Sequence, residues 1–458
     1  MAEHFDAAVI GAGQAGPSLA NRLTQAGKRI AMIERKRFGG TCVNTGCMPT
    51  KTMVASAYAA RIVARAADYG VRLDGKVSTD MLRVTARKDK VVNTASMNVE
   101  TWLKGMPNCT IYRASARLTS PTTLDVGGES ITADMIFLDV GARAVVPKIP
   151  GIEAVPYLTN ENVMDLDVVP KHLLILGGSY IGLEFAQMYR RFGAEVTVIE
   201  MAPRLLPRED EDISAAIREI IEGEGIRIHT DTKCTGLARK GNDILATIET
   251  PKGKSDISGS NLLVAVGRRP NTDGLGLESA GVKVDPRGII EVDDFCRTNV
   301  PNIYAMGECN GLGAFTHTAY NDYEIVAANL LDGDPRRISD RILTYGLFID
   351  PPLGRIGMTE AMARETGRKI LLGKRPMTHV GRAVEKGETQ GFMKVLVDAE
   401  TKKILGAAIL GTSGDEAVQC ITAIMYADVP YTVLQRAVLI HPTVSELIRT
   451  MLGEMKEL

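Results

Sequence analysis

The sequence contains one strand–turn–helix–strand unit twice. The first copy runs from "AAVIGAGQAG" to a second strand ending at Glu34, and its turn places Gly11, Gly13 and Gly16 in GxGxxG spacing. The second copy runs from "LLILGGSYIG" to Glu200. In both copies the acid follows the last glycine of the turn by the same number of residues. This combination predicts two βαβ units, each built to bind a dinucleotide.

The three glycines of the first turn have separate expected roles. Gly11 permits the tight turn, Gly13 lets the backbone approach a pyrophosphate, and Gly16 lets the helix pack closely on the strand. The amide groups at the helix N-terminus then face the phosphates. Glu34, at the end of the second strand, is expected to accept hydrogen bonds from a ribose.

The second turn departs from the first at one position. Gly177 and Gly182 keep the outer glycines, but Ser179 stands where the middle glycine would be. Glu200 favours a ribose with a free 2′-hydroxyl and therefore NADH, whereas Arg204 keeps NADPH possible. Two such units in one chain predict two dinucleotides, one a flavin carrier and the other a nicotinamide donor.

Bulk properties narrow the class of protein. The 458 residues suggest about three domains. The formal net charge of −1 makes nucleic acid an unexpected partner. No apolar run reaches the roughly 18 residues of a membrane span, and the N-terminus lacks a signal-peptide pattern. A globular cytoplasmic protein is expected.

Two of the seven cysteines, Cys42 and Cys47, lie close together in "GGTCVNTGCMPTKT". A zinc site, a structural disulfide and a redox-active pair are the alternatives. Zinc needs further ligands in a second close pair, which the sequence lacks, so no metal site is predicted. A structural disulfide is uncommon in a cytoplasmic chain. Pro49 marks a helix start at Cys47, where the helix dipole stabilises a thiolate. Redox chemistry therefore fits best.

The stretch "GGTCVNTGCMPTK" and the glycine turn before it closely resemble the class I flavoprotein disulfide reductases. "LLVAVGRRPNT", "TNVPNIYAMGEC" and "LIHPTVSE" resemble three later motifs of that family, in the same order. The resemblance covers essentially the whole chain. It implies FAD and NADH as cofactors and a fold of two Rossmann-like nucleotide-binding domains followed by an α+β dimerisation domain.

The resemblance also implies a catalytic set. Cys42 would be the thiol that attacks the acceptor, and Cys47 the thiol that faces the flavin. His441 would carry the proton of Cys42, and Glu446 would orient the imidazole. The family forms homodimers in which this base comes from the other subunit. Electrons would pass from NADH through FAD to the disulfide and then to the acceptor.

Further residues match family positions near the two cofactors. Lys51 and Glu184 would form a buried ion pair near the flavin ring. Glu308 replaces the usual Asp at the ribityl chain, and Val140 replaces a usual threonine. His317 either lies beside the flavin pyrimidine ring or is only a residue at a helix start. The remaining flavin contacts implied are Thr41, Ala116, Gly141 and Gly307, and the nicotinamide turn adds Gly267.

By this resemblance the chain divides into four parts. We expect an FAD-binding domain at residues 1–144, an NAD(P)-binding domain at 145–270, a central segment completing the FAD site at 271–340, and a dimerisation domain at 341–458.

The sequence is least informative about the electron acceptor. "PTKT", "PRED" and "VGRAVEKGETQGFMK" look closer to the mercuric-reductase-like and reactive-chlorine-resistance group than to lipoamide or glutathione enzymes. Mercuric reductases, however, use a C-terminal cysteine pair, whereas Cys420 is the last cysteine here. The predicted acceptor is a metal ion or small oxidant. Dihydrolipoamide dehydrogenase is the alternative, and a binding flavoprotein without turnover is a remote one.

Overall fold

The first glycine unit forms the middle of a seven-stranded sheet in the computed structural model, which describes residues 2–75 and 77–458. Strands β3, β2, β1, β6 and β16 run parallel in that order, and β5 and β4 continue from β6 as an antiparallel edge. The strands are β1 (Glu3–Ile10), β2 (Ile30–Ile33), β3 (Cys109–Tyr112), β4 (Ala116–Ser120), β5 (Thr123–Val126), β6 (Glu129–Leu138) and β16 (Ile303–Ala305).

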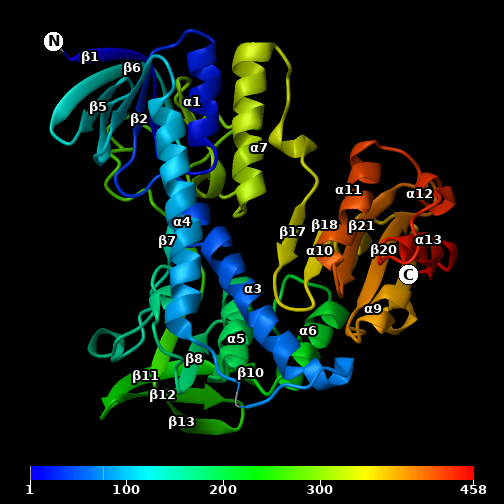
Figure 1. Cartoon of the computed structure of the whole chain (residues 1–458). Coiled ribbons are helices and arrows are strands. Elements are labelled where there is room, and N and C mark those ends of the chain that lie inside the picture. The colour runs from blue at the N-terminus through cyan, green and yellow to red at the C-terminus, as the bar shows by residue number, and fades with distance from the viewer. Residues whose placement is uncertain (1, 76) are drawn as a thin grey trace.

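Helices cover one face of this sheet. They are α1 (Gly16–Gln25), α4 (Met81–Lys104) and α7 (Thr316–Ala327). The end of β1 and all of β2 are buried, as expected for apolar parallel strands covered on both faces. Figure 1 shows α4 running from the first sheet toward the second, beside α3 (Cys47–Ala64). The short helix α2 (Gly40–Asn44) precedes α3.

The second glycine unit forms a parallel sheet in the order β10, β9, β8, β14. Its elements are β8 (His172–Leu176), α5 (Tyr180–Phe192), β9 (Glu195–Ile199), α6 (Glu211–Gly223), β10 (Arg227–His229) and β14 (Asn261–Val264). An antiparallel sheet lies beside it, made of β11 (Lys233–Lys240), β12 (Asp243–Thr250) and β13 (Gly253–Gly259). After β14, β15 (Arg268–Pro270) pairs with β7 (Ala142–Ala144), and the chain then returns to the first sheet as β16.

The C-terminal part is an antiparallel sheet in the order β17, β18, β21, β20, β19, β22, with helices packed on it. The strands are β17 (Thr344–Leu347), β18 (Leu353–Gly357), β19 (Ile370–Pro376), β20 (Phe392–Asp398), β21 (Ile404–Leu410) and β22 (Lys456–Glu457). The helices are α8 (Glu360–Glu365), α9 (Gly381–Glu385), α10 (Gly414–Ala417), α11 (Gln419–Tyr426), α12 (Thr432–Arg436) and α13 (Glu446–Gly453). The predicted fold class, two Rossmann-like units followed by an α+β part, is confirmed.

The nicotinamide-side unit and the C-terminal sheet share a core. One buried apolar cluster contains Leu183 and Phe185 of α5 together with Leu353 of β18 and Leu410 of β21. Met53 of α3 belongs to the same cluster. The helix that begins at Cys47 is therefore packed against both parts, which fixes the orientation of its N-terminus.

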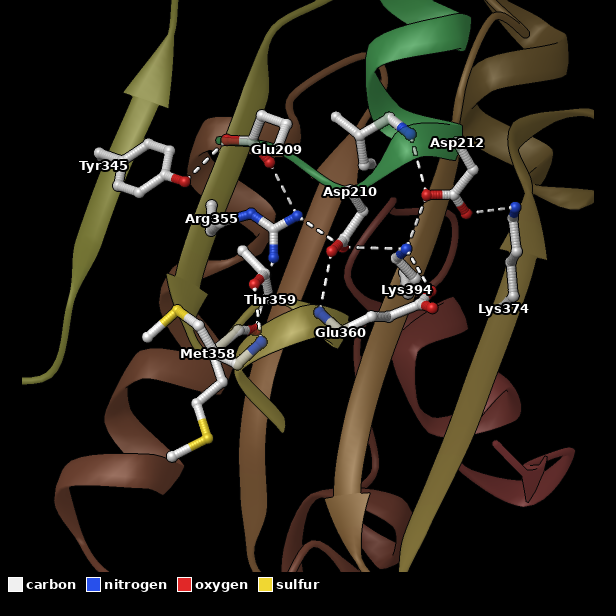
Figure 2. A network of polar contacts seen from close by, with 12 residues as sticks. Glu209, Asp210, Asp212, Tyr345, Arg355, Met358, Thr359, Glu360, Lys374 and Lys394 are labelled. Carbon is white, nitrogen blue, oxygen red and sulfur yellow. Dashed lines mark hydrogen bonds and ion pairs between the residues drawn. The ribbon is translucent and has the colours of Figure 1, made fainter. Parts of the chain in front are cut away.

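Charged side chains reinforce this contact where α6 begins (Figure 2). Arg355 of β18 is 1% exposed and pairs with Glu209 and Asp210, each at 2.8 Å. Lys394 of β20 is equally buried and contacts Asp210 at 2.9 Å and Asp212 at 2.7 Å. Buried charges of both signs compensate one another, so the loss of one would leave its partners buried without a counter-charge.

The same cluster is the one group of described carboxylates spaced to hold a metal ion. Asp210, Asp212 and Glu360 each offer an oxygen within 4.8 Å of the others. Lys394 Nζ lies among these oxygens, at 2.7 to 2.9 Å from each residue. The ammonium group already supplies the positive charge, and the cluster is structural.

None of the helices in the described part of the chain combines the length and apolar character needed to cross a membrane.

Candidate active site

The two glycine turns have matching geometry. Gly11 N donates to Ile33 O at 2.8 Å, and Gly177 N donates to Ile199 O at 2.9 Å, so each turn is tied to the end of its neighbouring strand. Both glycines have positive φ, at 102° and 107°. A Cβ there would come within 2.4 Å of a backbone carbonyl oxygen. Glycine is therefore required at the start of each turn for both reasons.

Each predicted ribose acid is held by backbone amides. Glu34 accepts hydrogen bonds from Ala12 N at 2.9 Å and Lys36 N at 2.7 Å. Glu200 accepts from Gly178 N at 2.6 Å and Ala202 N at 2.7 Å. Each carboxylate oxygen keeps a further lone pair. The two acids are thus fixed at the mouths of their turns, ready to accept from a hydroxyl group.

One cleft of about 2220 Å³ joins the two turns. It is lined by most of the predicted site residues, namely Gly11, Gly13, Glu34, Thr41, Cys42, Cys47, Lys51, Ala116, Gly141, Gly177, Ser179, Glu184, Glu200, Gly267, Glu308 and His317. Gly16 and Gly182 lie beneath their turns, where a Cβ would come within 2.3 Å of a backbone oxygen. They have the close-packing role predicted for the last glycine.

The cleft suits the flavin and nicotinamide dinucleotides in its chemistry. Asn44 Oδ1 and Arg341 Nη1 are buried, and neither has a hydrogen-bond partner among the described residues. Both residues line the cleft. A Cβ on Gly141 or Gly267 would meet nothing within 4 Å, so these backbones are open to close approach by a ligand. Unpaired buried polar atoms beside bare backbone are what a large polar cofactor would satisfy.

The cysteine pair spans the gap between α2 and α3. Cys42 lies within α2, and Cys47 is the first residue of α3. Both are free thiols. The neighbouring Cys42 thiol is the main cause that lowers the pKa of Cys47 to about 6, and the Thr316 hydroxyl, 3.2 Å away, and the Lys51 charge lower it further. The pKa of Cys42 is raised, chiefly by the neighbouring Cys47 thiol and also because Cys42 is half-buried.

The surroundings therefore favour the thiolate at Cys47 and the thiol at Cys42. This asymmetry matches a division between a sulfur held as an anion and a sulfur that must lose a proton before it attacks. Thr316 was not predicted as a site residue. It comes from the start of α7, and its only sequence signal was the neighbouring His317.

Lys51 and Glu184 form the predicted ion pair. Lys51 Nζ lies 2.8 Å and 3.0 Å from the two oxygens of Glu184, whose side chain is 8% exposed. Phe348, just after β17, completes the arrangement: its backbone N donates to Glu184 Oε1 at 3.0 Å, and its ring lies 4.5 Å from Lys51 Nζ. Phe348 was missed because nothing in its local sequence marks it.

Glu308 forms an ion pair with Arg268. Arg268 Nε donates to Glu308 Oε1 at 2.7 Å, and Arg268 Nη2 donates to Ala142 O at 2.7 Å. Arg268 belongs to the "GRRPNT" motif, so the longer acid reaches a cation from the other nucleotide-binding half. The neighbouring backbone at Val140 is held by Asn271 of the same motif, whose Nδ2 donates to Val140 O at 3.0 Å.

His317 lines the cleft at the start of α7. Its Nε2 lies 2.7 Å from Thr344 O, and its ring stacks on Phe315 with 5.5 Å between centroids. Burial lowers the pKa of His317, which favours the neutral imidazole. Phe315 stacks in turn on Tyr345, and Tyr180 meets both rings edge-on. These aromatic residues all line the cleft.

His441 and Glu446 contact each other but lie away from Cys42. His441 Nδ1 lies 3.0 Å and 3.1 Å from the two carboxylate oxygens of Glu446, and Thr443 N also donates to Glu446. The His441 side chain is 78% exposed. This pair sits at the start of α13, which Figure 1 shows on the far side of the C-terminal sheet from the start of α3. Within one chain, His441 and Glu446 therefore do not line the cleft that contains Cys42.

Comparison with known proteins agrees with this geometry. A model described as pyridine nucleotide-disulphide oxidoreductase matches residues 5–322, and the dimerisation domain of the same family matches residues 344–452. The chain belongs to the pyridine nucleotide-disulphide oxidoreductase family. The chain is therefore a flavoprotein disulfide oxidoreductase with a dimerisation domain.

Among curated proteins, the chain is 36% identical to a probable pyridine nucleotide-disulfide oxidoreductase, RclA, of Escherichia coli, covering 99% of both chains. It is 34% identical to a mercuric reductase of Streptomyces lividans (92% and 90% covered) and 33% identical to a dihydrolipoyl dehydrogenase of Thermus scotoductus (96% and 95% covered). It also resembles the solved Cu(II) complex of the HOCl-induced flavoprotein disulfide reductase RclA from Escherichia coli. The TM-score is 0.90 at 36% identity, covering 98% of this chain and 99% of that one.

Proposed function

We propose that this chain is an NADH-dependent flavoprotein reductase that passes electrons through Cys42 and Cys47 to a metal ion, with Cu(II) as the leading candidate. The observation that carries the proposal is the asymmetric cysteine pair, with a stabilised thiolate at Cys47 and a proton held at Cys42, in a cleft shared by two nucleotide turns. A plain flavin carrier needs no such pair.

FAD is assigned to the first turn and NADH to the second. Glu34 would hold the ribose of FAD, and Lys51, Glu308 and His317 would surround the rest of it. FAD, when bound, supplies a ring that accepts a hydride from the nicotinamide and passes electrons on in pairs. Glu200 supports NADH: its carboxylate is held by Gly178 N and Ala202 N at the second turn, and a carboxylate there would repel a 2′-phosphate.

Residues of the chain itself would stabilise the thiolate of Cys47 and accept the proton of Cys42. Reduction of the Cys42–Cys47 disulfide takes two electrons and one proton and would yield one thiolate, stabilised at Cys47 by Thr316 and Lys51, and one thiol at Cys42. Reoxidation by two Cu(II) ions would restore the disulfide and give two Cu(I) ions and one proton. The proton of Cys42 needs an acceptor, and we assign that role to His441.

The base must then come from a second copy of the chain. His441 is exposed, and its neighbours Val438 and Ile440 are 94% and 80% exposed, so this loop presents apolar surface as well as the imidazole. Exposed apolar residues beside a functional group mark a contact surface. A homodimer in which each C-terminal loop reaches the partner's Cys42 accounts for both features.

Cu(II) is preferred as acceptor because RclA of Escherichia coli, which the chain matches over 99% of its length, was solved as a Cu(II) complex. Dihydrolipoamide is the second candidate, because dihydrolipoyl dehydrogenases match almost as much of the chain.

The test is anaerobic NADH oxidation with Cu(II), Hg(II) or lipoamide, each against a control without acceptor and a control without protein. Fast turnover with Cu(II) and none with lipoamide supports the proposal. Fast turnover with lipoamide alone overturns it in favour of the second candidate.

A further inference from the structure

Asp139 places a buried carboxylate directly beneath the first glycine turn. It follows β6, its N donates to Ile10 O at 2.8 Å, and the residue is only 7% exposed. Asp139 Oδ2 accepts a hydrogen bond from Gly16 N at 2.8 Å, and the amides of Gly13 and Ala15 also act on the carboxyl group. A Cβ on Gly13 would fall 2.7 Å from Asp139 Oδ2. The absence of a side chain at Gly13 therefore makes room for this acid.

The second turn shows that a glycine turn does not need such an acid. Ala265 is the counterpart of Asp139, because Ala265 N donates to Leu176 O at 2.8 Å and a Cβ on Gly177 would lie 2.4 Å from Ala265 O. The corresponding distance from Gly11 to Asp139 O is 2.2 Å. The two turns close in the same way, with an acid beneath one and a methyl group beneath the other.

The position of Asp139 puts it in competition with a bound phosphate. The amides at the start of α1 carry the positive end of the helix dipole, which favours an anion. The carboxylate of Asp139 already uses that positive potential, and the diphosphate of FAD would bring further negative charge to the same turn. Two adjacent anions in a buried site disfavour each other, and protonation of one relieves the repulsion.

The other titratable groups around Asp139 do not neutralise it. Glu34, at the end of β2, acts on it as a second negative charge. Cys309, which follows β16, has its own pKa raised to about 12 by burial and is neutral. Asp322 of α7 accepts from Gly307 N and is paired with Arg341, so that cation is already engaged. Burial raises the pKa of Asp139 to about 7, although the turn amides act in the opposite direction.

We propose that Asp139 takes up one proton when the diphosphate of FAD binds at the first glycine turn, so that the affinity for FAD falls as the pH rises. The inference rests on the assignment of FAD to that turn. Without the cofactor, the carboxyl group ionises as the pH passes about 7. With the diphosphate beside it the pKa is higher, and between the two values binding consumes a proton from solvent.

The test measures FAD binding to the purified protein as a function of pH. Free FAD is separated by ultrafiltration and quantified by fluorescence between pH 6 and 9 at constant ionic strength. Uptake of one proton weakens binding by up to about tenfold per pH unit above pH 7. Asp139→Asn keeps the shape of the side chain but cannot ionise, and we expect its dissociation constant to be nearly flat over this range. Glu34→Gln is the control: it weakens binding and, by removing a negative charge near Asp139, moves the titration to lower pH, but binding still weakens as the pH rises.

A second measurement does not depend on any variant. Calorimetric titration of the FAD-free protein with FAD at pH 8, in buffers of different ionisation enthalpy, should show uptake of about one proton per FAD. Equal pH slopes in the parent protein and Asp139→Asn, or no proton uptake, would overturn the inference and leave the FAD assignment intact. Absence of FAD binding at every pH would overturn both.

Discussion

At the scale of single residues, the two cysteines owe their different protonation to their neighbours. Thr316 offers a hydroxyl 3.2 Å from Cys47 Sγ, and that bond favours the thiolate. Thr316→Val removes the bond and leaves a side chain of similar size. We expect the pKa of Cys47 to rise by roughly one unit, because a hydrogen bond of this kind is worth about 1 kcal/mol. Ultraviolet thiolate absorbance of the reduced protein against pH measures it.

The matched control is Thr318→Val, two residues on, where the hydroxyl bonds Phe315 and does not contact Cys47. An unchanged titration in Thr316→Val, with Cys47→Ser used to assign the signal, would show that the Thr316 hydroxyl does not stabilise the thiolate.

A second prediction concerns His441, the proposed acceptor of the Cys42 proton. His441→Ala removes the proposed proton acceptor of Cys42 and should slow oxidation of the dithiol by the acceptor on the order of 100-fold, while flavin reduction by NADH changes little. Rapid mixing resolves the two steps. Glu446→Gln, which keeps the imidazole but weakens its orientation, should give a smaller loss. Equal slowing of both steps would contradict the assigned role.

At the scale of elements, the sequence revealed the parts that are local in the chain and missed those that are not. The glycine turns, their terminal acids and the helix start at Cys47 were predicted because each depends on residues within about 30 positions. Thr316, Phe348 and Arg268 were missed because they reach the site from distant elements, brought there only by tertiary packing. Asp139 was missed because its counterpart in the second turn, Ala265, is apolar, so the repeat itself gave no signal.

The contact between α6 and the C-terminal sheet carries an element-scale prediction. Arg355→Met leaves Glu209 and Asp210 buried without their cation, and should lower the free energy of unfolding by about 3 kcal/mol or more. Lys374→Met is the control. Lys374 pairs with Asp212 near the surface, and its loss should cost no more than about 1 kcal/mol. Urea unfolding at one protein concentration compares them, and equal losses would refute the buried network as a stabilising contact.

At the scale of the whole molecule, the proposed role of His441 and its separation from Cys42 imply that one complete site needs two copies of the chain. Cys42→Ser is expected to be inactive toward the acceptor, and His441→Ala to be slowed on the order of 100-fold. When equal amounts are mixed under exchange conditions, about half of the dimers should be heterodimers, and each heterodimer contains one intact site of two. About a quarter of the parental activity should therefore return. If no activity returns although exchange is shown by mass, each chain must supply its own base.

The central claim is that electrons pass through the cysteine pair, and an anaerobic NADH titration tests it most directly. Flavin and disulfide each store two electrons, so the parent protein should consume about two NADH per flavin before it is fully reduced. Cys42→Ser cannot form the disulfide and should consume about one. If the parent protein also consumed only one, the cysteine pair would lie outside the electron path.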